Sequence, residues 1–291
     1  VTRSTAIRVG DLLEPDRLRE RLRMICPLRT RELQALGLDV PPLDPEAIAD
    51  EHIRLGEILA PHVTDTTWLL HEELGRGRRL LFEGANASLL DVDHGTFPYV
   101  TSSHSSTLGI PAGTGLPGRT IGRTVGIMKA YATRVGAGPF PTEDAGPAGD
   151  RIRQRGREFG TTTGRPRRCG WLDLVALRYT SMINGVTGLA VMLLDVLSGF
   201  DTIKVCTEYR LPDGSTTDRF VPDGAWLSRV GPVWREMPGW DEPIETARSV
   251  DELPPAARSY LEFISGHLGV PLELISVGPG RDQTIRPRSS G

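Results

Sequence analysis

The sequence predicts an α/β fold preceded by a mainly helical segment. Residues 1–80 place apolar side chains at helical spacing, which indicates amphipathic helices. In residues 81–291, short apolar runs alternate with amphipathic stretches, a pattern typical of a sheet flanked by helices. The turn sequence LPDG at 211–214 lies between two alternating segments and predicts an added β-hairpin.

The first part of the chain combines helix signals with one strand signal. DPEAIADEHIRLGEILAPHV is an amphipathic helix with Asp44 as its cap and Pro45 in its first turn, and Pro61 ends or kinks it. The short apolar run RRLLFE at 78–83 predicts a strand. A loop rich in glycine and hydroxyl residues follows at 91–120, and loops of this length in compact enzymes are usually functional or disordered.

The second part of the chain alternates the predicted elements in order. Polar residues at 144–158 predict an exposed excursion, and Trp171 is expected in the core. The periodicity predicts helices over 121–133, 171–184 and 256–268, buried strands over 189–195 and 273–277, and hairpin strands over 201–210 and 216–221.

Composition narrows the class of protein. The chain has 291 residues, 38% hydrophobic residues and a net charge of −3, which argues against a protein that coats nucleic acid. Cys26, Cys169 and Cys206 show no CxxC spacing, as expected in a reducing cytosol. The start lacks a signal-peptide pattern, and no apolar run is long enough to span a bilayer. We therefore expect a soluble cytoplasmic protein without nucleic-acid or membrane partners.

The stretch TTTGRPRR at 161–168 combines hydroxyls, a glycine and arginines. Arginine presents a planar fork that matches carboxylates and phosphates, and Gly164 permits close approach or a positive φ. A clamp for an anion and a basic surface loop explain this segment equally well on its own.

The loop after residue 83 carries two weaker signals. Asp91, Asp93 and His94 are spaced as metal ligands, but a hydrogen-bonded turn explains a D-x-D-H cluster better. The hydroxyl cluster at Thr101–Ser103 is of the kind that holds a phosphate, or it is a polar strand end.

Two predicted strands are followed by residues of a kind found in nucleotide-binding sites. The run LAVMLLDVLSG ends in Asp195, which is either a strand-end cap or an acceptor for a guanine base. ELISVGPGRD places small residues after a strand, where a base or ribose could lie. The sequence contains no G-x-x-x-x-G-K-[ST] phosphate loop and no G-x-S-x-G elbow.

Taken in order, these segments resemble the adenylosuccinate synthetase family. The resemblance rests on LLFEGANASLLDVDHGTFPYVTSS, GIMKAYATRVGAGPFPTE, GREFGTTTGRPRRCGWLDLVALR, LLDVLSG, ISVGPG and IRVGDL, and covers nearly the whole chain. It implies a sheet related to P-loop NTPases, flanked by helices, in one domain over 1–291 with a helical segment at 1–80 and an α/β core at 81–291. It also implies a ligase that joins IMP and L-aspartate with GTP and Mg²⁺, acting as a homodimer.

The resemblance assigns binding roles residue by residue. For IMP, it points to Asn86, Thr101, Val135 and Arg165. For aspartate, it points to Thr161, Thr162, Thr163, Gly164, Arg165, Pro166 and Arg167. For GTP, it points to Arg167, Leu193, Leu194, Asp195, Ser276, Val277 and Gly278.

The departures from the family pattern define the alternatives. The family's N-terminal third, with its phosphate loop, aspartate base, histidine and Mg²⁺ ligands, is not in this sequence, so no catalytic residue or metal ligand is assigned here; a complementing N-terminal polypeptide could supply it. Asn86 stands where the family has glutamine, and Leu193 where it has lysine. A relative with altered purine or triphosphate specificity, and a non-catalytic paralogue or subunit, are therefore the alternatives.

Overall fold

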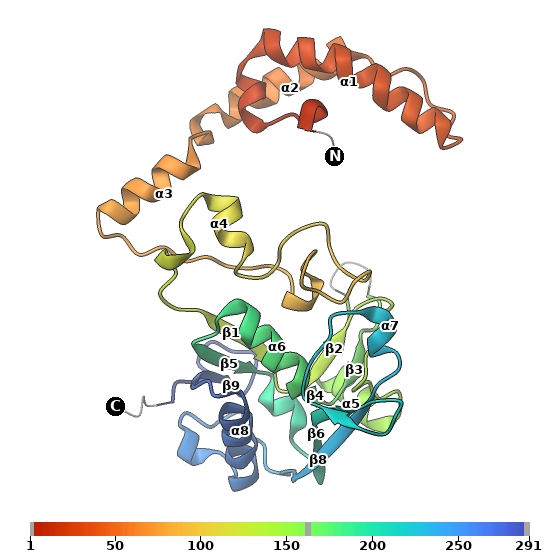
Figure 1. The fold of residues 1–291 in the computed structure, drawn as a ribbon. Helices are drawn as coiled ribbons and strands as arrows, with labels where there is room; N and C mark the ends of the chain where they lie inside the picture. The colour runs from red at the N-terminus through yellow and green to blue at the C-terminus, as the bar shows by residue number, and fades with distance from the viewer. Residues whose placement is uncertain (1–2, 161–163, 288–291) are drawn as a thin grey trace. The chain divides into compact units, whose positions relative to one another are not determined.

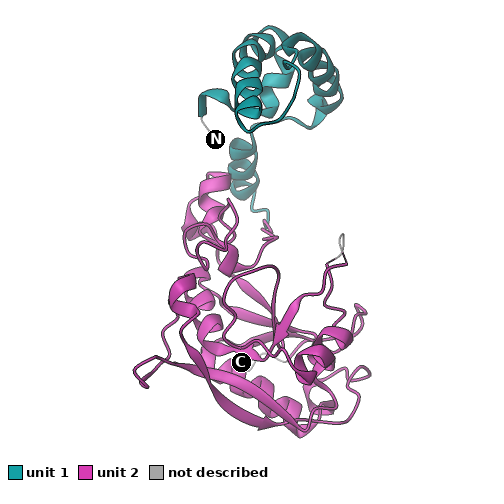
Figure 2. Cartoon of the chain, turned by 90° about the vertical axis from the view of Figure 1, so that its right-hand side faces the viewer, with its two compact units in different colours: residues 1–79 teal, residues 80–291 magenta. Residues whose placement is uncertain are grey.

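The computed structural model describes residues 3–160 and 164–287. The chain divides into two compact units, Val1–Arg79 and Leu80–Gly291, shown in two colours in Figure 2. Each unit has its own buried cluster of apolar side chains.

The first unit is helical. It contains α1 (Pro15–Ala35), α2 (Pro45–Leu59) and α3 (Thr66–Gly75), with the short 3-10 turns η1 (Arg3–Thr5), η2 (Val9–Leu13) and η3 (Ala60–His62). The predicted cap is confirmed, because the Asp44 carboxylate accepts hydrogen bonds from the backbone of Glu46 and Ala47. Pro61 lies in η3, just after α2 ends, also as predicted. A small cluster of Leu18, Leu22, Cys26 and Ala49 joins α1 to α2.

The second unit is built on a parallel sheet (Figure 1). Its strands are β1 (Val125–Lys129), β5 (Gly188–Met192), β9 (Leu272–Ser276) and β10 (Thr284–Ile285), in the order β1-β5-β9-β10. β1, β5 and β9 run parallel, and β10 pairs antiparallel with β9. α6 (Leu174–Asn184) and α8 (Pro255–Leu268) pack against each other.

Two smaller sheets complete this unit. β2 (Ala132–Arg134) pairs antiparallel with β3 (Arg168–Gly170). β6 (Thr202–Arg210) pairs with β4 (Leu172–Asp173), β7 (Thr216–Thr217) and β8 (Gly231–Pro238). The remaining elements are α4 (Gly109–Thr114), α5 (Pro147–Arg155) and α7 (Gly224–Leu227), with the 3-10 turns η4 (Ser88–Leu90), η5 (Gly118–Thr120), η6 (Leu194–Leu197) and η7 (Val250–Glu252).

Three predicted elements are wrong. Residues 121–133 contain β1 and the start of β2 instead of a helix, because pairing with β5 outweighs the local preference of this segment. Residues 78–83 form no strand, and Leu81 is 92% exposed. An apolar run forms a strand only when a neighbouring strand supplies backbone hydrogen bonds, and this run has no such neighbour. The polar segment 144–158 is not a loose excursion, because it forms α5 and buries Ile152 completely.

Other predictions hold. α6, α8, β5 and β9 lie where the periodicity placed them, although α6 begins three residues later than predicted because Leu172–Asp173 is a strand. The LPDG turn joins β6 to β7, but the long antiparallel partner of β6 is β8, which the sequence pattern did not reveal. Trp171 lies in the core, as expected. The α/β class is therefore confirmed.

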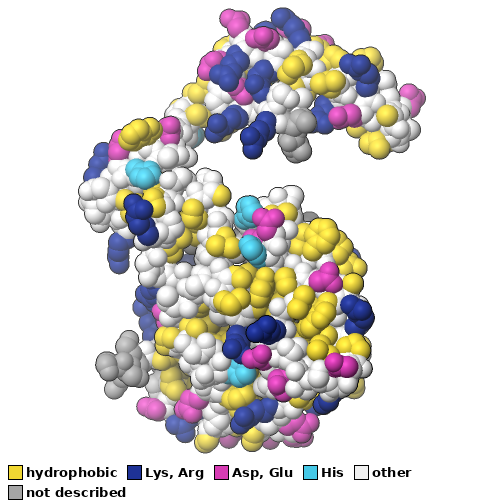
Figure 3. All heavy atoms as spheres, viewed as in Figure 1, with side chains coloured by type: hydrophobic (Ala, Val, Ile, Leu, Met, Phe, Trp, Pro, Cys, Tyr) yellow, Lys and Arg dark blue, Asp and Glu magenta, His cyan; other side chains and the backbone are white. Residues whose placement is uncertain are grey.

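The surface mixes side-chain types. Basic, acidic and apolar side chains are interspersed on the faces in view in Figure 3. Of the helices that the structure describes, none has the length and apolar character needed to cross a membrane.

Candidate functional site

The parallel sheet brings the ends of three strands to one edge. The carboxyl ends of β1, β5 and β9 lie at the same edge because the strands are parallel. Lys129 ends β1, the segment from Leu193 to Asp195 follows β5, and Ser276 ends β9. Ligands of α/β sheets bind in crevices at this edge. Two of the three segments assigned to GTP by resemblance therefore meet here, since η6 contacts β9.

The segment after β5 presents an acceptor with no partner. Leu193 adopts a left-handed conformation, with φ 61°, and turns the chain sharply into η6. Among the residues that the structure describes, Asp195 Oδ1 is buried and has no hydrogen-bond partner. Burial raises the pKa of Asp195, and the nearby Glu245 charge adds to this effect while Arg155 opposes it. Buried acceptors are nearly always hydrogen-bonded, so this oxygen is open to a donor from a ligand.

The backbone of the Asp195 turn is fixed from α5. Arg155 donates to the carbonyl oxygen of Asp195 at 2.9 Å and to the carbonyl oxygen of Ser198. These bonds fix the turn and leave the carboxylate of Asp195 available. This role of Arg155 was not predicted, because its segment was expected to be an exposed excursion.

The loop after β9 is tightly closed. Ser276 Oγ donates to the Gly278 carbonyl at 2.9 Å, and Val277 N donates to the Gln283 carbonyl at 2.9 Å. A Cβ atom at Gly278 would lie 2.5 Å from the end of the Gln283 side chain, so a larger residue there would displace that side chain. Gln283 also accepts from Gly280 N and donates to the Glu245 carbonyl. A single side chain thus holds the loop against a second segment.

The loop that contains the TTTGRPRR stretch, called here the arginine loop, is closed at its base by hairpin pairing. Phe159 pairs with Pro166, Gly160 N donates to the Arg165 carbonyl at 2.8 Å, and Arg167 N donates to the Glu158 carbonyl at 2.9 Å. Gly164 has φ 63°, the conformation for which glycine was expected there. Thr161, Thr162 and Thr163 lie outside the described residues. Backbone hydrogen bonds therefore hold the base of the loop, while Arg165 and Pro166 are exposed.

The side chain of Arg167 is anchored to a buried carboxylate. Arg167 Nη1 lies 2.7 Å from Glu158 Oε2. Glu158 is 1% exposed and also accepts from Lys129 Nζ and from the Tyr131 hydroxyl, each at 2.6 Å. Burial alone would raise the pKa of Glu158, but these three donors outweigh it and lower the pKa. Sequence reasoning missed Glu158, Lys129 and Tyr131 as parts of the site; an acidic residue among arginines in GREFG was the available signal.

The loop that carries Thr101 is organised by Asp91. The buried Asp91 carboxylate accepts from the backbone of Asp93, His94, Ser105 and Ser106, and from the Ser106 hydroxyl. Burial tends to raise its pKa, but these bonds hold the pKa far below its ordinary value. The turn interpretation of D-x-D-H is thus confirmed. In the described part of the chain, no group of three acidic, histidine or cysteine side chains is placed to hold a metal.

The three remaining IMP positions differ in how far the structure supports them. Thr101 N donates to the Leu90 carbonyl at 2.8 Å. The Thr101 hydroxyl lies 3.0 Å from Ser103 Oγ, so these two hydroxyl groups lie together in the fold. Val135 follows β2 and is 70% exposed. Its neighbour Arg134 reaches Thr96 Oγ1 at 3.3 Å, which ties the β2 end to the Thr101 loop. Asn86 is exposed in an irregular segment before η4.

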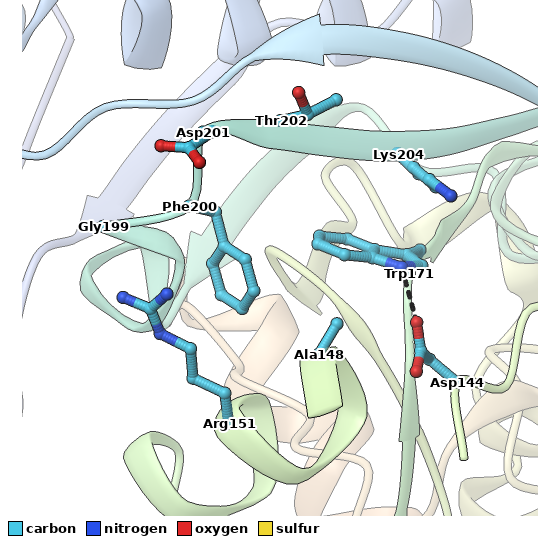
Figure 4. Close-up of a pocket in the computed structure, with 9 residues that line it drawn as sticks. All are labelled: Asp144, Ala148, Arg151, Trp171, Gly199, Phe200, Asp201, Thr202 and Lys204. Carbon is cyan, nitrogen blue, oxygen red and sulfur yellow. Dashed lines mark hydrogen bonds between the residues drawn. The ribbon is translucent and has the colours of Figure 1, made fainter. Parts of the chain in front are cut away.

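A separate cavity of about 380 Å³ lies beside α5 (Figure 4). It is lined by two acidic and two basic side chains, Asp144, Asp201, Arg151 and Lys204, so its charges balance. Its rings belong to the core: Trp171 donates to Asp144 at 3.1 Å, and Phe200 lies under the Arg151 guanidinium. This cavity was not predicted, and its buried rings and balanced charge give it no preference for an anionic ligand.

Comparisons with known proteins identify relatives along nearly the whole chain. The family model described as adenylosuccinate synthetase matches residues 1–285. An adenylosuccinate synthetase from Salinibacter ruber is 50% identical over 281 residues, covering 97% of this chain and 64% of the relative. One from Alkaliphilus metalliredigens is 45% identical, with 97% and 65% covered. The chain thus spans slightly less than two thirds of the length of these relatives.

A solved structure agrees with the sequence comparison. The fully ligated adenylosuccinate synthetase from Plasmodium falciparum superposes with a TM-score of 0.89 at 33% identity. The superposition covers 97% of this chain and 66% of that structure. The similarity therefore includes the arrangement of the elements as well as the sequence motifs.

Proposed function

The chain belongs to the adenylosuccinate synthetase family, and we propose that it carries substrate-binding loops of a ligase that joins IMP and L-aspartate at the expense of GTP. In this reaction the γ-phosphoryl group of GTP is transferred to the 6-oxygen of IMP. The aspartate amine then attacks C6, and phosphate leaves with that oxygen. The enzyme would act in the synthesis of purine nucleotides.

The observation that carries the proposal is the unpartnered oxygen of Asp195. A guanine base presents two neighbouring N–H donors, at N1 and N2, which a carboxylate can accept together. Asp195 offers this acceptor at the sheet edge, beside the closed loop from Ser276 to Gly278. We assign the guanine base of GTP to this place, with Leu193, Leu194 and Val277 as its surroundings.

The other assignments follow the loops. Thr101, Asn86 and Val135 would contact IMP, and the segment 161–167 would bind aspartate. Arg165 would bridge aspartate and IMP, and Arg167 would lie between aspartate and GTP. These ligands carry phosphates and carboxylates, so arginine side chains and backbone N–H groups are suitable stabilisers of the charge that moves during transfer.

We assign no magnesium ligands to the residues of this chain. Mg²⁺ prefers oxygen ligands and usually binds through one or two carboxylates and substrate phosphates. The described residues offer no cluster of carboxylates for it. The family's Mg²⁺ ligands are expected in the N-terminal segment that this sequence does not include. We therefore assign no step to a metal held by this chain.

A changed triphosphate preference is a second candidate. Leu193, which replaces the lysine expected there, packs against the core instead of presenting a charge to the base. The pocket of Asp195 thus lacks one cation that a GTP site of this family has. An enzyme that uses ATP in place of GTP would be the result, with the same chemistry on the purine.

The test is turnover with each substrate varied in the full-length protein. We expect D195N to raise KM for GTP by about 100-fold, because an amide nitrogen donates and cannot replace the second carboxylate oxygen as an acceptor for guanine. KM for IMP and aspartate should change less than about threefold. D201N is the control, since Asp201 is an exposed aspartate a few residues away. Preference of the wild-type protein for ATP would favour the second candidate, and absence of any turnover would contradict both.

Two further assignments concern the setting of the protein. We propose a cytoplasmic homodimer. The three cysteines are buried and unpaired, as in proteins of a reducing compartment. The first unit exposes large apolar side chains, among them Leu36, Ile58 and Trp68, which a second copy could cover.

A further inference from the structure

The buried carboxylate of Glu158 joins two segments, the end of β1 with the residues that follow it and the base of the arginine loop. Lys129 ends β1, Tyr131 lies between β1 and β2, and Arg167 lies at the base of the arginine loop. Glu158 is 1% exposed, so water cannot replace these partners. The cluster Lys129–Tyr131–Glu158–Arg167, called here the Glu158 cluster, is a fixed junction between the sheet edge and the loop.

The charges of this cluster do not cancel. Lys129 and Arg167 carry two positive charges, and Glu158 carries one negative charge that its three donors keep ionised. Lys129 Nζ also donates to Thr133 Oγ1 at 3.1 Å, which holds it toward β2. The side chain of Arg167 remains 30% exposed. One positive charge is therefore left over, and it is shared by two partly exposed cations, Lys129 at 29% and Arg167 at 30%.

The backbone holds Arg167 in the same direction. Arg167 N donates to the Glu158 carbonyl, and the Arg167 carbonyl accepts from Arg153 Nε at 2.8 Å. Pro166 precedes Arg167 and restricts its own φ, and it pairs with Phe159 across the hairpin. The backbone bonds fix where the Arg167 side chain begins, and Glu158 fixes where its guanidinium lies.

We infer that Glu158 is a positioning residue that sets the guanidinium of Arg167 for its anionic ligand, with Lys129 and Tyr131 orienting the carboxylate. This inference rests on the proposed function, in which Arg167 binds aspartate and lies next to GTP. A long arginine side chain has many rotamers, and a fixed partner removes most of them before the ligand arrives. Glu158 itself is too deeply buried to touch a substrate.

The test compares E158Q with a control variant in a second ion pair, which is made by Arg168, the residue after Arg167. We expect E158Q to raise KM for aspartate and for GTP at least about tenfold while KM for IMP changes less than about threefold, in the full-length protein. The control is E143Q, which breaks the half-buried Arg168–Glu143 pair at the neighbouring position. E143Q should lower the melting temperature without changing KM for aspartate.

A third variant separates this inference from the proposed function. If R167L leaves every KM unchanged, the proposed role of Arg167 is wrong and the inference fails with it. If R167L raises KM for aspartate and E158Q does not, the proposed function stands and the positioning role of Glu158 is wrong. If E158Q does not fold, E158D decides. With unchanged circular dichroism, a rise in KM for aspartate of at least about threefold supports the inference, and an unchanged KM overturns it.

Discussion

At the scale of the residue, three carboxylates of the second unit show how surroundings set a role. Asp91 accepts hydrogen bonds from its own turn and from Ser105 and Ser106 at the other end of the same loop, so it serves structure. The Glu158 carboxylate accepts hydrogen bonds from Lys129 at the end of β1 and from Arg167, an arginine of the candidate site. Asp195 keeps one buried oxygen without a partner in the described chain. Residue type alone does not separate these cases, but the list of donors does.

A fourth carboxylate, Asp173, leads to a prediction about pH. It is buried at the start of α6, where it accepts from Ala176 N and from the Tyr209 hydroxyl. Burial raises the pKa of Asp173 to about 6 from 3.8, although these bonds oppose the rise. The folded protein therefore holds the proton more tightly than the unfolded chain. The free energy of unfolding should fall by up to about 3 kcal/mol as pH rises from about 4 to about 6.

The variant D173N isolates this effect. Asparagine keeps a cap acceptor but does not titrate, so the difference between wild type and variant should follow pH over that window. Urea denaturation at several pH values measures it. D223N is the control, because Asp223 caps α7 and is more exposed. Equal pH slopes for wild type and D173N would show that Asp173 does not titrate there.

At the scale of the element, the sequence predicted best where one signal agreed with the final packing. α8 and β9 have the expected periodicity and lie as expected. β1 was mistaken for a helix because VGIMK becomes a strand only by pairing with β5, more than sixty residues later. The Glu158 cluster was missed for the same reason, since its members are joined across the fold. The strand β5 was recognisable because its apolar run is a local feature, although it ends at Met192, and the role of Asp195 after it stays a prediction.

The helix that the sequence did not predict, α5, provides a test of element packing. Gly149 lies in its first turns, and a Cβ atom there would collide with the Asp144 carbonyl oxygen. We expect G149A to lower the free energy of unfolding by about 1–3 kcal/mol, because the helix must shift away from Asp144 and Cys169. The matched control is G266A in α8, where a Cβ atom meets nothing within 4 Å.

The control should have the opposite sign. Alanine is a better helix former than glycine, so G266A should raise the free energy of unfolding by up to about 1 kcal/mol. Chemical denaturation of both variants provides the comparison. If G149A were as stable as wild type, α5 would not be closely packed at this point.

At the scale of the whole molecule, the net charge is opposite to what the proposed ligands need. The chain carries −3, while IMP, GTP and aspartate are anions. We therefore expect attraction from local groups, and the surplus positive charge of the Glu158 cluster is suited to provide it. Such short-range attraction depends on loop geometry more than on overall charge. The positioning of Arg167 accordingly matters more than the number of arginines.

The apolar surface of the first unit leads to the last prediction, a homodimer. Ile58 and Trp68 are 67% and 69% exposed, and their unit has a core of only a few side chains in its described part. Burying each against a second copy would contribute on the order of 2 kcal/mol. I58D and W68D should each raise the dissociation constant of the dimer at least about tenfold, measured by analytical ultracentrifugation.

The control for the dimer is a similar substitution on the other unit. Met182 in α6 is 70% exposed, so M182D adds the same charge without touching the first unit. It should leave the dissociation constant unchanged if the first unit forms the interface. A wild-type protein that sediments as a monomer at micromolar concentration would contradict the prediction. Equal weakening by M182D and I58D would place the contact elsewhere or make it a general effect of charge, since a true interface responds only to the side chains that it buries.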